Sequence, residues 1–368
     1  MLSEDDIVLR LWMFLAGFAL RGAPPMELAR RFLPVVVGAR VGDAMGAPSE
    51  GMSAEDITAR FGWIDTFAGD GTDDSLMATL LADALFASDG HAGADGWAEQ
   101  WVSQRDRMQA IRDRFFPSVL HTADKLAWGS FPPRRVAVGN MPSSSSAMCI
   151  WPVGLVNAGD PRAAADQAYA LAALIHVGEV DFCQDAAAAM AAAVAAGLRP
   201  GASVADVRNE ALSALHPTSG APMRELIRDA VAEAESASGY EAFRERYHRR
   251  FRRAIACDSR ETVPAAFALT TLAEADLRRG VELAANFGRD TDTIATMTGA
   301  LCGAIGGPET VPEAWLAALG PSAVLEAEGL AERLAELARA KVADRERLVR
   351  TVPGLVDERT VDRDSPRR

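Results

Sequence analysis

The feature of this sequence that most restricts its fold is the spacing of its apolar residues, which is helical along almost the whole chain. Residues 72–86 carry an apolar stripe that returns every three or four positions, and residues 290–305 repeat the arrangement. Alternating β-branched residues, which would predict strands, are nearly absent. The spacing therefore predicts an all-α protein.

An alanine-dense stretch, residues 161–198, predicts closely packed helices. Small residues recur in it at i, i+3 and i+4, a spacing that lets neighbouring helices approach one another in a core. Gly178 and Glu179 interrupt the stretch. We therefore expect two helices, one on each side of this interruption.

The charge balance excludes some classes of partner. The 368 residues contain 51 acidic and 38 basic side chains, which gives a formal net charge of -13. Such a chain repels phosphate backbones, so nucleic acid is not an expected partner.

The apolar run at residues 7–20 is shorter than the roughly 20 residues that span a bilayer, and no membrane partner is expected. Four cysteines without a CxxC pair predict neither zinc nor disulfides, which favours a cytoplasmic location.

The chain divides into three expected segments. Residues 1–28 are predicted to form an N-terminal helical extension, residues 29–339 the main domain, and residues 340–368 a charged, disordered tail. Two stretches rich in Gly, Pro and Ser, residues 62–71 and 127–146, lack any period and are predicted to be long loops. Loops of this length in a compact domain are often functional.

Two of the predicted helices begin with a surplus of oxygen-bearing side chains. Residues 72–75 read Thr-Asp-Asp-Ser, and residues 290–293 read Asp-Thr-Asp-Thr. One such residue is enough to cap a helix, and capping alone is the simpler interpretation of either segment. The extra carboxylates would repel one another unless cations neutralise them. If the two helix starts face each other, they form an oxygen-lined cage suited to two Mg²⁺ or Mn²⁺ ions.

A third segment, residues 38–50, combines closely spaced small residues with two acids. The spacing predicts a tightly packed helix that ends before Pro48. Asp43 then lies inside the helix, where a single acid is more often hydrogen-bonded structurally than catalytic. Glu50 follows the turn and is the freer of the two.

In order and spacing, these segments resemble motifs of the ADP-ribosylglycohydrolase family. The matching stretches are Gly-Asp-Ala-Met-Gly-Ala-Pro-x-Glu at residues 42–50, Thr-Asp-Asp-Ser at 72–75, Glu-Thr-Val-Pro-Ala-Ala at 261–266 and Ala-Asn-Phe-Gly-Arg-Asp-Thr-Asp-Thr-Ile-Ala at 285–295. The combination is specific, whereas any one motif is weak. The resemblance implies a compact, single-domain, all-α helical bundle with a dinuclear magnesium centre, for which Mn²⁺ is an alternative metal.

The resemblance also implies roles for individual residues. The metal ligands at matching positions are Thr72, Asp73, Asp74, Asp290, Asp292 and Thr293. A ribose would approach the metals and its glycosidic bond would be cleaved by a metal-held water, with Glu50 or a ligand such as Asp74 as general base. The serine-rich loop and a histidine would contact the substrate; these residues are Ser144, Ser145, Ser146 and His176. Without the resemblance, a single histidine on an alanine-rich helix is more often a hydrogen-bonded core residue.

Two departures from the family pattern predict an altered choice of substrate. Cys149 replaces an arginine after the serine-rich loop, and Arg289 stands where the family commonly has glycine. Arg289 could pair with Asp290 or bind a substrate phosphate. The expected partner is an ADP-ribosylated protein or a small phosphorylated ligand.

Three functions remain open from the sequence. The leading one is a magnesium-dependent hydrolase of ADP-ribosyl or related ribosyl conjugates. The second is a lyase-like or cyclase-like magnesium-dependent reaction on a small phosphorylated or diphosphate substrate in the same acidic cage. The third is a non-catalytic binding descendant, which the full set of acids argues against because unused clustered charges destabilise a fold.

Overall fold

The computed structural model describes residues 24–69, 71–129 and 131–357, and within them the chain forms helices and no strand. The α-helices are α2 (Pro24–Gly46), α3 (Ala54–Phe61), α4 (Asp73–Ala87), α5 (Ala94–Ser103), α6 (Arg105–Ala110), α7 (Pro117–Ala127), α8 (Pro133–Val136), α9 (Trp151–Val156), α10 (Pro161–Ala172), α11 (Phe182–Gly197), α12 (Val204–Ala214), α13 (Ala221–Glu235), α14 (Tyr240–Phe251), α15 (Ser259–Leu272), α16 (Leu277–Ala285), α17 (Thr291–Gly306) and α18 (Glu313–Asp357). Short 3₁₀ turns are η1 (Ala47–Ser49), η2 (Arg112–Arg114), η3 (Gly178–Val180) and η4 (Pro308–Thr310). The prediction of an all-α protein is confirmed.

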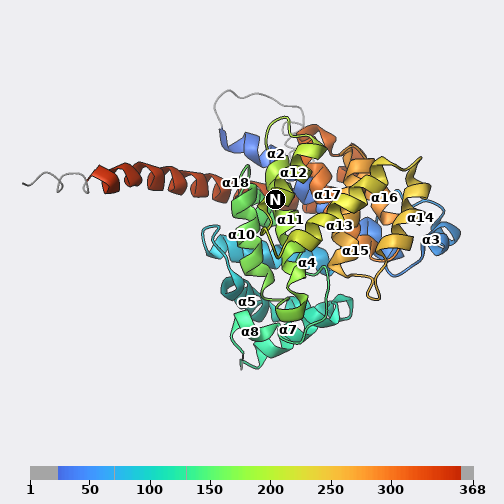
Figure 1. Ribbon diagram of the computed structural model, residues 1–368, viewed down its shortest axis with the longest axis horizontal. Coiled ribbons are helices and arrows are strands. Elements are labelled where there is room, and N and C mark those ends of the chain that lie inside the picture. Colours follow the sequence, from blue (N-terminus) through green and yellow to red (C-terminus); the bar gives the residue numbers. More distant parts are fainter. Residues whose placement is uncertain (1–23, 70, 130, 358–368) are drawn as a thin grey trace, which may run out of the picture.

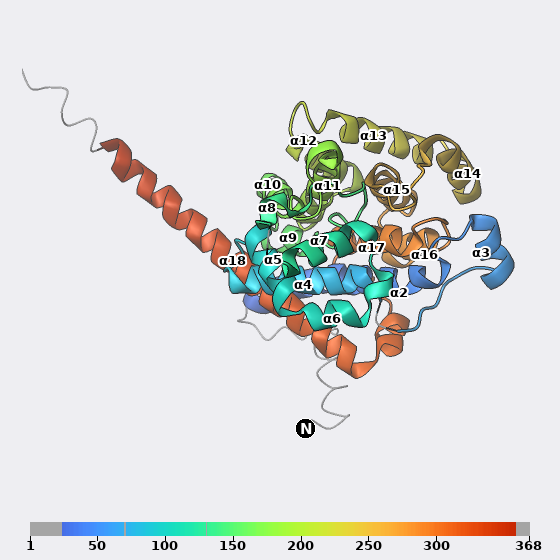
Figure 2. The ribbon, with the colours of Figure 1, turned by 90° about the horizontal axis from the view of Figure 1, so that it is seen from below.

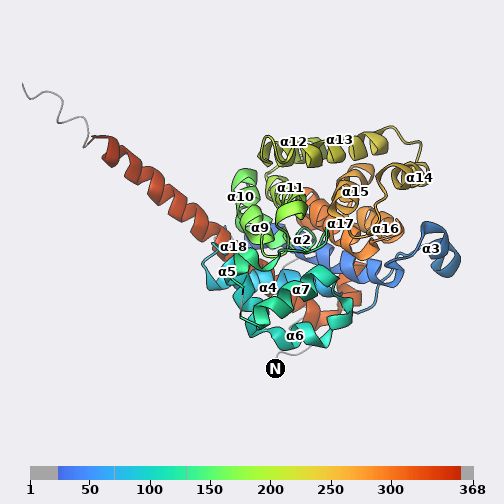
Figure 3. The same ribbon diagram turned by 60° about the horizontal axis from the view of Figure 1, so that its bottom comes forward.

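The centre of the bundle is the contact between α2 and α17, which lie side by side beneath the outer helices (Figures 2 and 3). Glycines on α2 allow their backbones to touch. A Cβ atom on Gly42 would lie 2.2 Å from the carbonyl oxygen of Ala295, and one on Gly46 would lie 2.4 Å from the Cα of Asp292. The small residues of the third segment therefore bring the end of α2 against the start of α17.

The alanine-dense stretch forms two helices, α10 and α11, separated by η3, as its interruption predicts. Helix α11 packs against α10, α12, α9 and α17, and nearly all of its residues are buried. Alanine methyl groups are small enough for this close packing on every side. A separate cluster of buried residues includes Phe243 and Tyr247 of α14 and Phe287, which follows α16. It supports α16 and the beginning of α17.

The C-terminal helix differs from the sequence expectation. Helix α18 is broken at Gly320, which has φ of 78°, and then continues through residue 340 to Asp357, where a disordered tail was expected. Figure 1 shows its last turns projecting away from the bundle. Residues 24–28, placed in the N-terminal extension, belong to α2. Residues 1–23, with the apolar run at 7–20, and residues 358–368 lie outside the described residues.

The helices in the described part of the chain include none that is both long and apolar enough to cross a membrane.

Candidate metal centre

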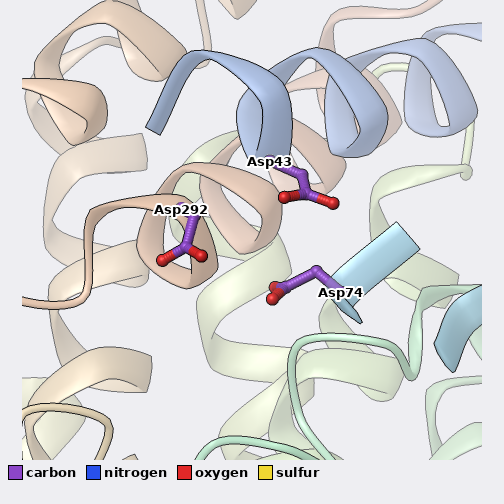
Figure 4. A group of neighbouring side chains, drawn as sticks. All are labelled: Asp43, Asp74 and Asp292. Atoms are coloured by element: carbon purple, nitrogen blue, oxygen red, sulfur yellow. The ribbon is translucent and has the colours of Figure 1, made fainter. Parts of the chain in front are cut away.

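Three carboxylates from three helices point toward one another inside the protein (Figure 4). Asp43 lies on α2, Asp74 in the first turn of α4 and Asp292 in the first turn of α17, and all three are buried. Each offers one carboxylate oxygen, and these oxygens lie within 4.8 Å of one another. The two acidic helix starts therefore do face each other, and Asp43 joins them.

A second group of carboxylates shares Asp292 with the first. Its other members are Asp290, the buried residue that precedes α17, and Glu50, the exposed residue that follows η1. Their oxygens also lie within 4.8 Å of one another. Two oxygen clusters joined by one carboxylate are the donor set that a pair of divalent cations about 3.5–4 Å apart requires.

Burial raises the pKa of the acids in both clusters and of Asp73, which lines the same cleft. Loss of hydration is the first cause for Asp73, whose pKa rises to about 8, and for Asp290, whose pKa rises to about 7. The pKa values of Asp74 and Asp292 lie well above 3.8, because burial is reinforced by neighbouring carboxylates. A bound cation would reverse this effect, since it favours the charged form of each acid.

Two atoms of the first cluster give an independent indication of a missing cation partner. Oδ1 of Asp74 and Oδ1 of Asp292 are buried and have no hydrogen-bond partner within the described residues. Buried polar atoms of folded proteins almost always have a partner. The clusters could therefore hold metal ions, and the all-oxygen donor set suits hard cations rather than zinc.

Asp43 is hydrogen-bonded structurally, as its place inside a helix suggested. It also belongs to the first carboxylate cluster, a second role that was not expected from the sequence. Its Oδ2 accepts hydrogen bonds from the backbone N–H groups of Thr72 and Ser75 at 2.7 and 3.0 Å, and its Oδ1 accepts one from the Thr72 hydroxyl at 2.8 Å. These bonds fix the start of α4 and hence Asp74. The signal for the second role was Gly42 and Gly46, which mark the face of α2 that meets α17.

The other expected ligands surround the clusters. Asp73 and Thr293 line the same cleft as Asp290, and the Thr293 hydroxyl donates to Oδ2 of Asp74 at 3.4 Å. The Thr72 hydroxyl donates its proton to Asp43, so its oxygen lone pairs are not used in that bond. Five of the six expected ligands and Glu50 thus line one cleft, and Thr72 lies behind it, against Asp43.

A cleft of about 310 Å³ leads to these acids. Phe115, Phe116 and Ile255 contribute apolar lining, and the cations that line it are Arg114 and Arg289. The guanidinium of Arg114 forms no ion pair or side-chain hydrogen bond within the described residues, although its charge lowers the pKa of Glu50 against the larger raising effect of burial. Arg114 was not singled out in the sequence, where nothing distinguishes it from other surface arginines.

The serine-rich loop reaches the cleft with only part of its length. Ser144 and Ser145 line it, and the Ser144 hydroxyl lies 3.2 Å from Oδ2 of Asp290. Ser146 and His176 are fully buried instead. The two ring nitrogens of His176 lie 2.9 Å from the hydroxyls of Ser143 and Ser146, so this histidine holds the loop from below rather than lining the cleft. Its pKa falls to about 3 because burial disfavours the charged ring.

The side chains of Cys149 and Arg289, the two departures from the family pattern, have other contacts than those expected. Cys149 is fully buried beneath the loop, with its thiol 3.3 Å from the carbonyl oxygen of Ser145. Arg289 does line the cleft, but its guanidinium pairs with Glu261, at 2.8 and 2.9 Å, and not with Asp290. Neither residue offers a free side chain to a ligand.

The sequence comparisons agree with this geometry. The family model for ADP-ribosylglycohydrolase matches residues 24–344. The chain belongs to this family. Among curated proteins similar to this chain, "Uncharacterized protein YegU" of Escherichia coli (strain K12) is 28% identical over 312 residues, 78% of this chain and 91% of the relative. An "Uncharacterized protein" of Archaeoglobus fulgidus is 26% identical over 329 residues, 84% of this chain and 97% of the relative.

A solved structure of an ADP-ribosylglycohydrolase-related protein complex shares the fold. Its TM-score is 0.63 at 20% sequence identity, and the match covers 85% of this chain and 99% of that one. The single-domain bundle expected from the resemblance is therefore the fold of the family.

Proposed function

We propose that this protein is a magnesium-dependent hydrolase that cleaves the glycosidic bond of ADP-ribosyl or related ribosyl conjugates. The observation that carries the proposal is the pair of carboxylate clusters joined by Asp292 at the base of a cleft. Membership of the ADP-ribosylglycohydrolase family supports a ribosyl substrate. The substrate is proposed to be an ADP-ribosylated protein or a small phosphorylated ligand, met in the cytoplasm.

The proposed metal-holding residues are those that surround the unpartnered carboxylate oxygens. They are Asp73, Asp74, Asp290, Asp292 and Thr293, which line the cleft, and Thr72, which contacts Asp43; they would hold two Mg²⁺ ions, which Mn²⁺ can replace. Bound magnesium would supply Lewis acidity and would orient the ribose hydroxyls and the attacking water. Asp43 contributes a further buried carboxylate to the same group.

Glu50 is the proposed general base. Glu50 is an exposed residue whose partly desolvated carboxylate lines the cleft, whereas Asp74 is buried and has one oxygen near the Thr293 hydroxyl. A proton acceptor must reach the water that attacks the anomeric carbon, which favours the exposed residue. Burial also raises the pKa of Glu50, and general bases act best when their pKa approaches the working pH.

The lining of the cleft suits the charge that develops during the reaction. Cleavage of a ribosyl bond places positive charge on the sugar ring in the transition state. Glu50, Asp290 and Asp73 line the cleft, and their carboxylates would stabilise a positive charge on a sugar ring bound there. Ser144 and Ser145 supply hydroxyl groups for the remainder of the substrate.

The test of this proposal replaces Glu50 by glutamine, which keeps the size of the side chain and removes its charge. We expect Glu50→Gln to lower kcat for a ribosyl conjugate by about 10²–10⁴-fold, the usual contribution of a general base. Calorimetry should show that Mg²⁺ still binds. If this variant is as fast as the parent, proton transfer belongs to another acid. If the magnesium-loaded parent cleaves only diphosphate esters, the lyase-like or cyclase-like reaction on a diphosphate substrate is the correct function.

A further inference from the structure

The loop that carries Glu50 is attached to the connection between α16 and α17. We call residues 49–52 the Glu50 loop. On one side of Glu50, the fully buried hydroxyl of Ser49 lies 2.8 Å from the carbonyl oxygen of Ala285 and 3.0 Å from the hydroxyl of Thr291. The first half of the loop is therefore held by both ends of that connection.

On the other side of Glu50, the loop pairs with Arg289 through the backbone. The N–H of Gly51 donates to the carbonyl oxygen of Arg289 at 2.6 Å, and the N–H of Arg289 donates to the carbonyl oxygen of Met52 at 2.8 Å. Glu50 is thus bracketed by contacts to residues 285–291, the same segment that carries Asp290. Whatever fixes this segment also fixes the distance between Glu50 and the metal-holding acids.

The backbone of Arg289 adopts a conformation that requires support. Its φ is 72°, in the left-handed region that side chains other than glycine seldom occupy. The side chain supplies the support: Nε and Nη2 donate to the two carboxylate oxygens of Glu261, and Nη2 also donates to the carbonyl oxygen of Arg253 at 2.6 Å. The carboxylate of Glu261 is only 1% exposed, so the fork of two bonds to it is a buried and strong contact.

We infer that Arg289 is a positioning residue whose ion pair with Glu261 holds the Glu50 loop, and so places the Glu50 carboxylate beside Asp290 and Asp292. Its guanidinium touches none of the reacting groups, and it acts through the backbone of the loop. The consequence for catalysis rests on the proposed function, whereas the mechanical link does not.

The link is tested by hydrogen–deuterium exchange of the Glu50 loop in the magnesium-loaded protein. Arg289→Gly tolerates the positive φ and removes the guanidinium. Because it leaves the buried Glu261 carboxylate with only the backbone N–H of Arg253 as a partner, the double variant Arg289→Gly with Glu261→Gln is measured beside it. Exchange at the Gly51 amide should rise by about tenfold or more in both, since its acceptor is no longer held. A matched control is Arg260→Ala, a change beside Glu261 on α15 that removes a two-bond ion pair with the buried Asp258 that caps this helix. It should leave exchange in the loop unchanged.

The catalytic consequence is tested by combining Arg289→Gly with Glu50→Gln. If Arg289 acts through Glu50, Arg289→Gly alone lowers kcat with little change in KM. Arg289→Gly combined with Glu50→Gln is then no slower than Glu50→Gln alone. The inference would be overturned if the losses of kcat in Arg289→Gly and Glu50→Gln multiply when the two changes are combined. Unchanged hydrogen–deuterium exchange in the Glu50 loop of Arg289→Gly would also overturn it. If the parent cleaves no ribosyl conjugate, the proposed function fails, and the exchange measurement still decides whether the link exists.

Discussion

A Cβ atom on Gly42 would lie 2.2 Å from the carbonyl oxygen of Ala295, so α2 and α17 touch backbone to backbone just where each contributes an acid to the carboxylate clusters. Gly42→Ala must push the two helices apart, and we expect it to lower the free energy of unfolding by about 1–3 kcal/mol. Weaker binding of Mg²⁺ should accompany the loss, because Asp43 and Asp292 lie beside this contact.

Gly96→Ala is the matched control for Gly42→Ala. Gly96 lies in α5, and a Cβ atom there would meet nothing within 4 Å. This change should raise the free energy of unfolding by about 0.5–1 kcal/mol, because alanine loses less backbone freedom than glycine on folding. Urea unfolding measures both variants. Equal effects of the two changes would show that the α2–α17 contact is looser than described.

Asp292 belongs to both carboxylate clusters, and this predicts an unequal effect of single substitutions on metal binding. Asp292→Asn should abolish binding at both positions, whereas Glu50→Gln should leave binding at the Asp43–Asp74 cluster intact. Titration calorimetry with Mg²⁺ and with Mn²⁺ measures the stoichiometry. Two metal ions bound to Asp292→Asn would contradict the shared cage.

The raised pKa values predict a dependence of stability on pH in the metal-free protein. Burial raises the pKa of Asp73 to about 8 and of Asp290 to about 7, above the ordinary 3.8 expected of the unfolded chain. Between about pH 4 and about pH 8 the folded protein therefore holds protons that the unfolded chain has released, so its stability falls as pH rises.

Melting curves with a chelator and with Mg²⁺ measure this effect. In the chelator, Tm should be lower at about pH 8 than at about pH 5, and the rise in Tm on adding Mg²⁺ should be larger at the higher pH, since metal binds the deprotonated acids. Asp73→Asn and Asp290→Asn should each make the metal-free curve flatter. A Tm that rises with pH in the chelator would contradict the assignment.

Arg114 is the cleft-lining cation whose guanidinium is not engaged within the described residues, which predicts a role in holding an anionic part of the substrate. Arg114→Ala should weaken binding of ADP-ribose by about tenfold, the value of one hydrogen bond to a charged group, and should not change binding of uncharged ribose. Arg135→Ala, on α8, is a control outside the lining of the cleft. Equal losses for both ligands would show that Arg114 acts on the shape of the cleft instead.

The sequence predicted those features that local pattern determines. Helices α4 and α17 begin within one residue of the expected positions because capping groups and apolar spacing are both local. The contacts that join distant segments were not predictable in this way. The ion pair of Arg289 with Glu261 and the burial of His176 beneath Ser143 depend on how helices pack, and neither residue's neighbours in the sequence indicate its partner.

The central claim is that the acids around Asp292 form a divalent-cation centre that cleaves ribosyl conjugates. The most direct measurement is release of ADP-ribose from a set of N-linked and O-linked ADP-ribosyl conjugates, with Mg²⁺ and with a chelator, by the parent and by Asp292→Asn. We expect release from at least one conjugate by the magnesium-loaded parent, none with the chelator and none by the variant. Release that continues in the chelator or in Asp292→Asn, or no release from any conjugate by a parent that has bound Mg²⁺, would contradict it.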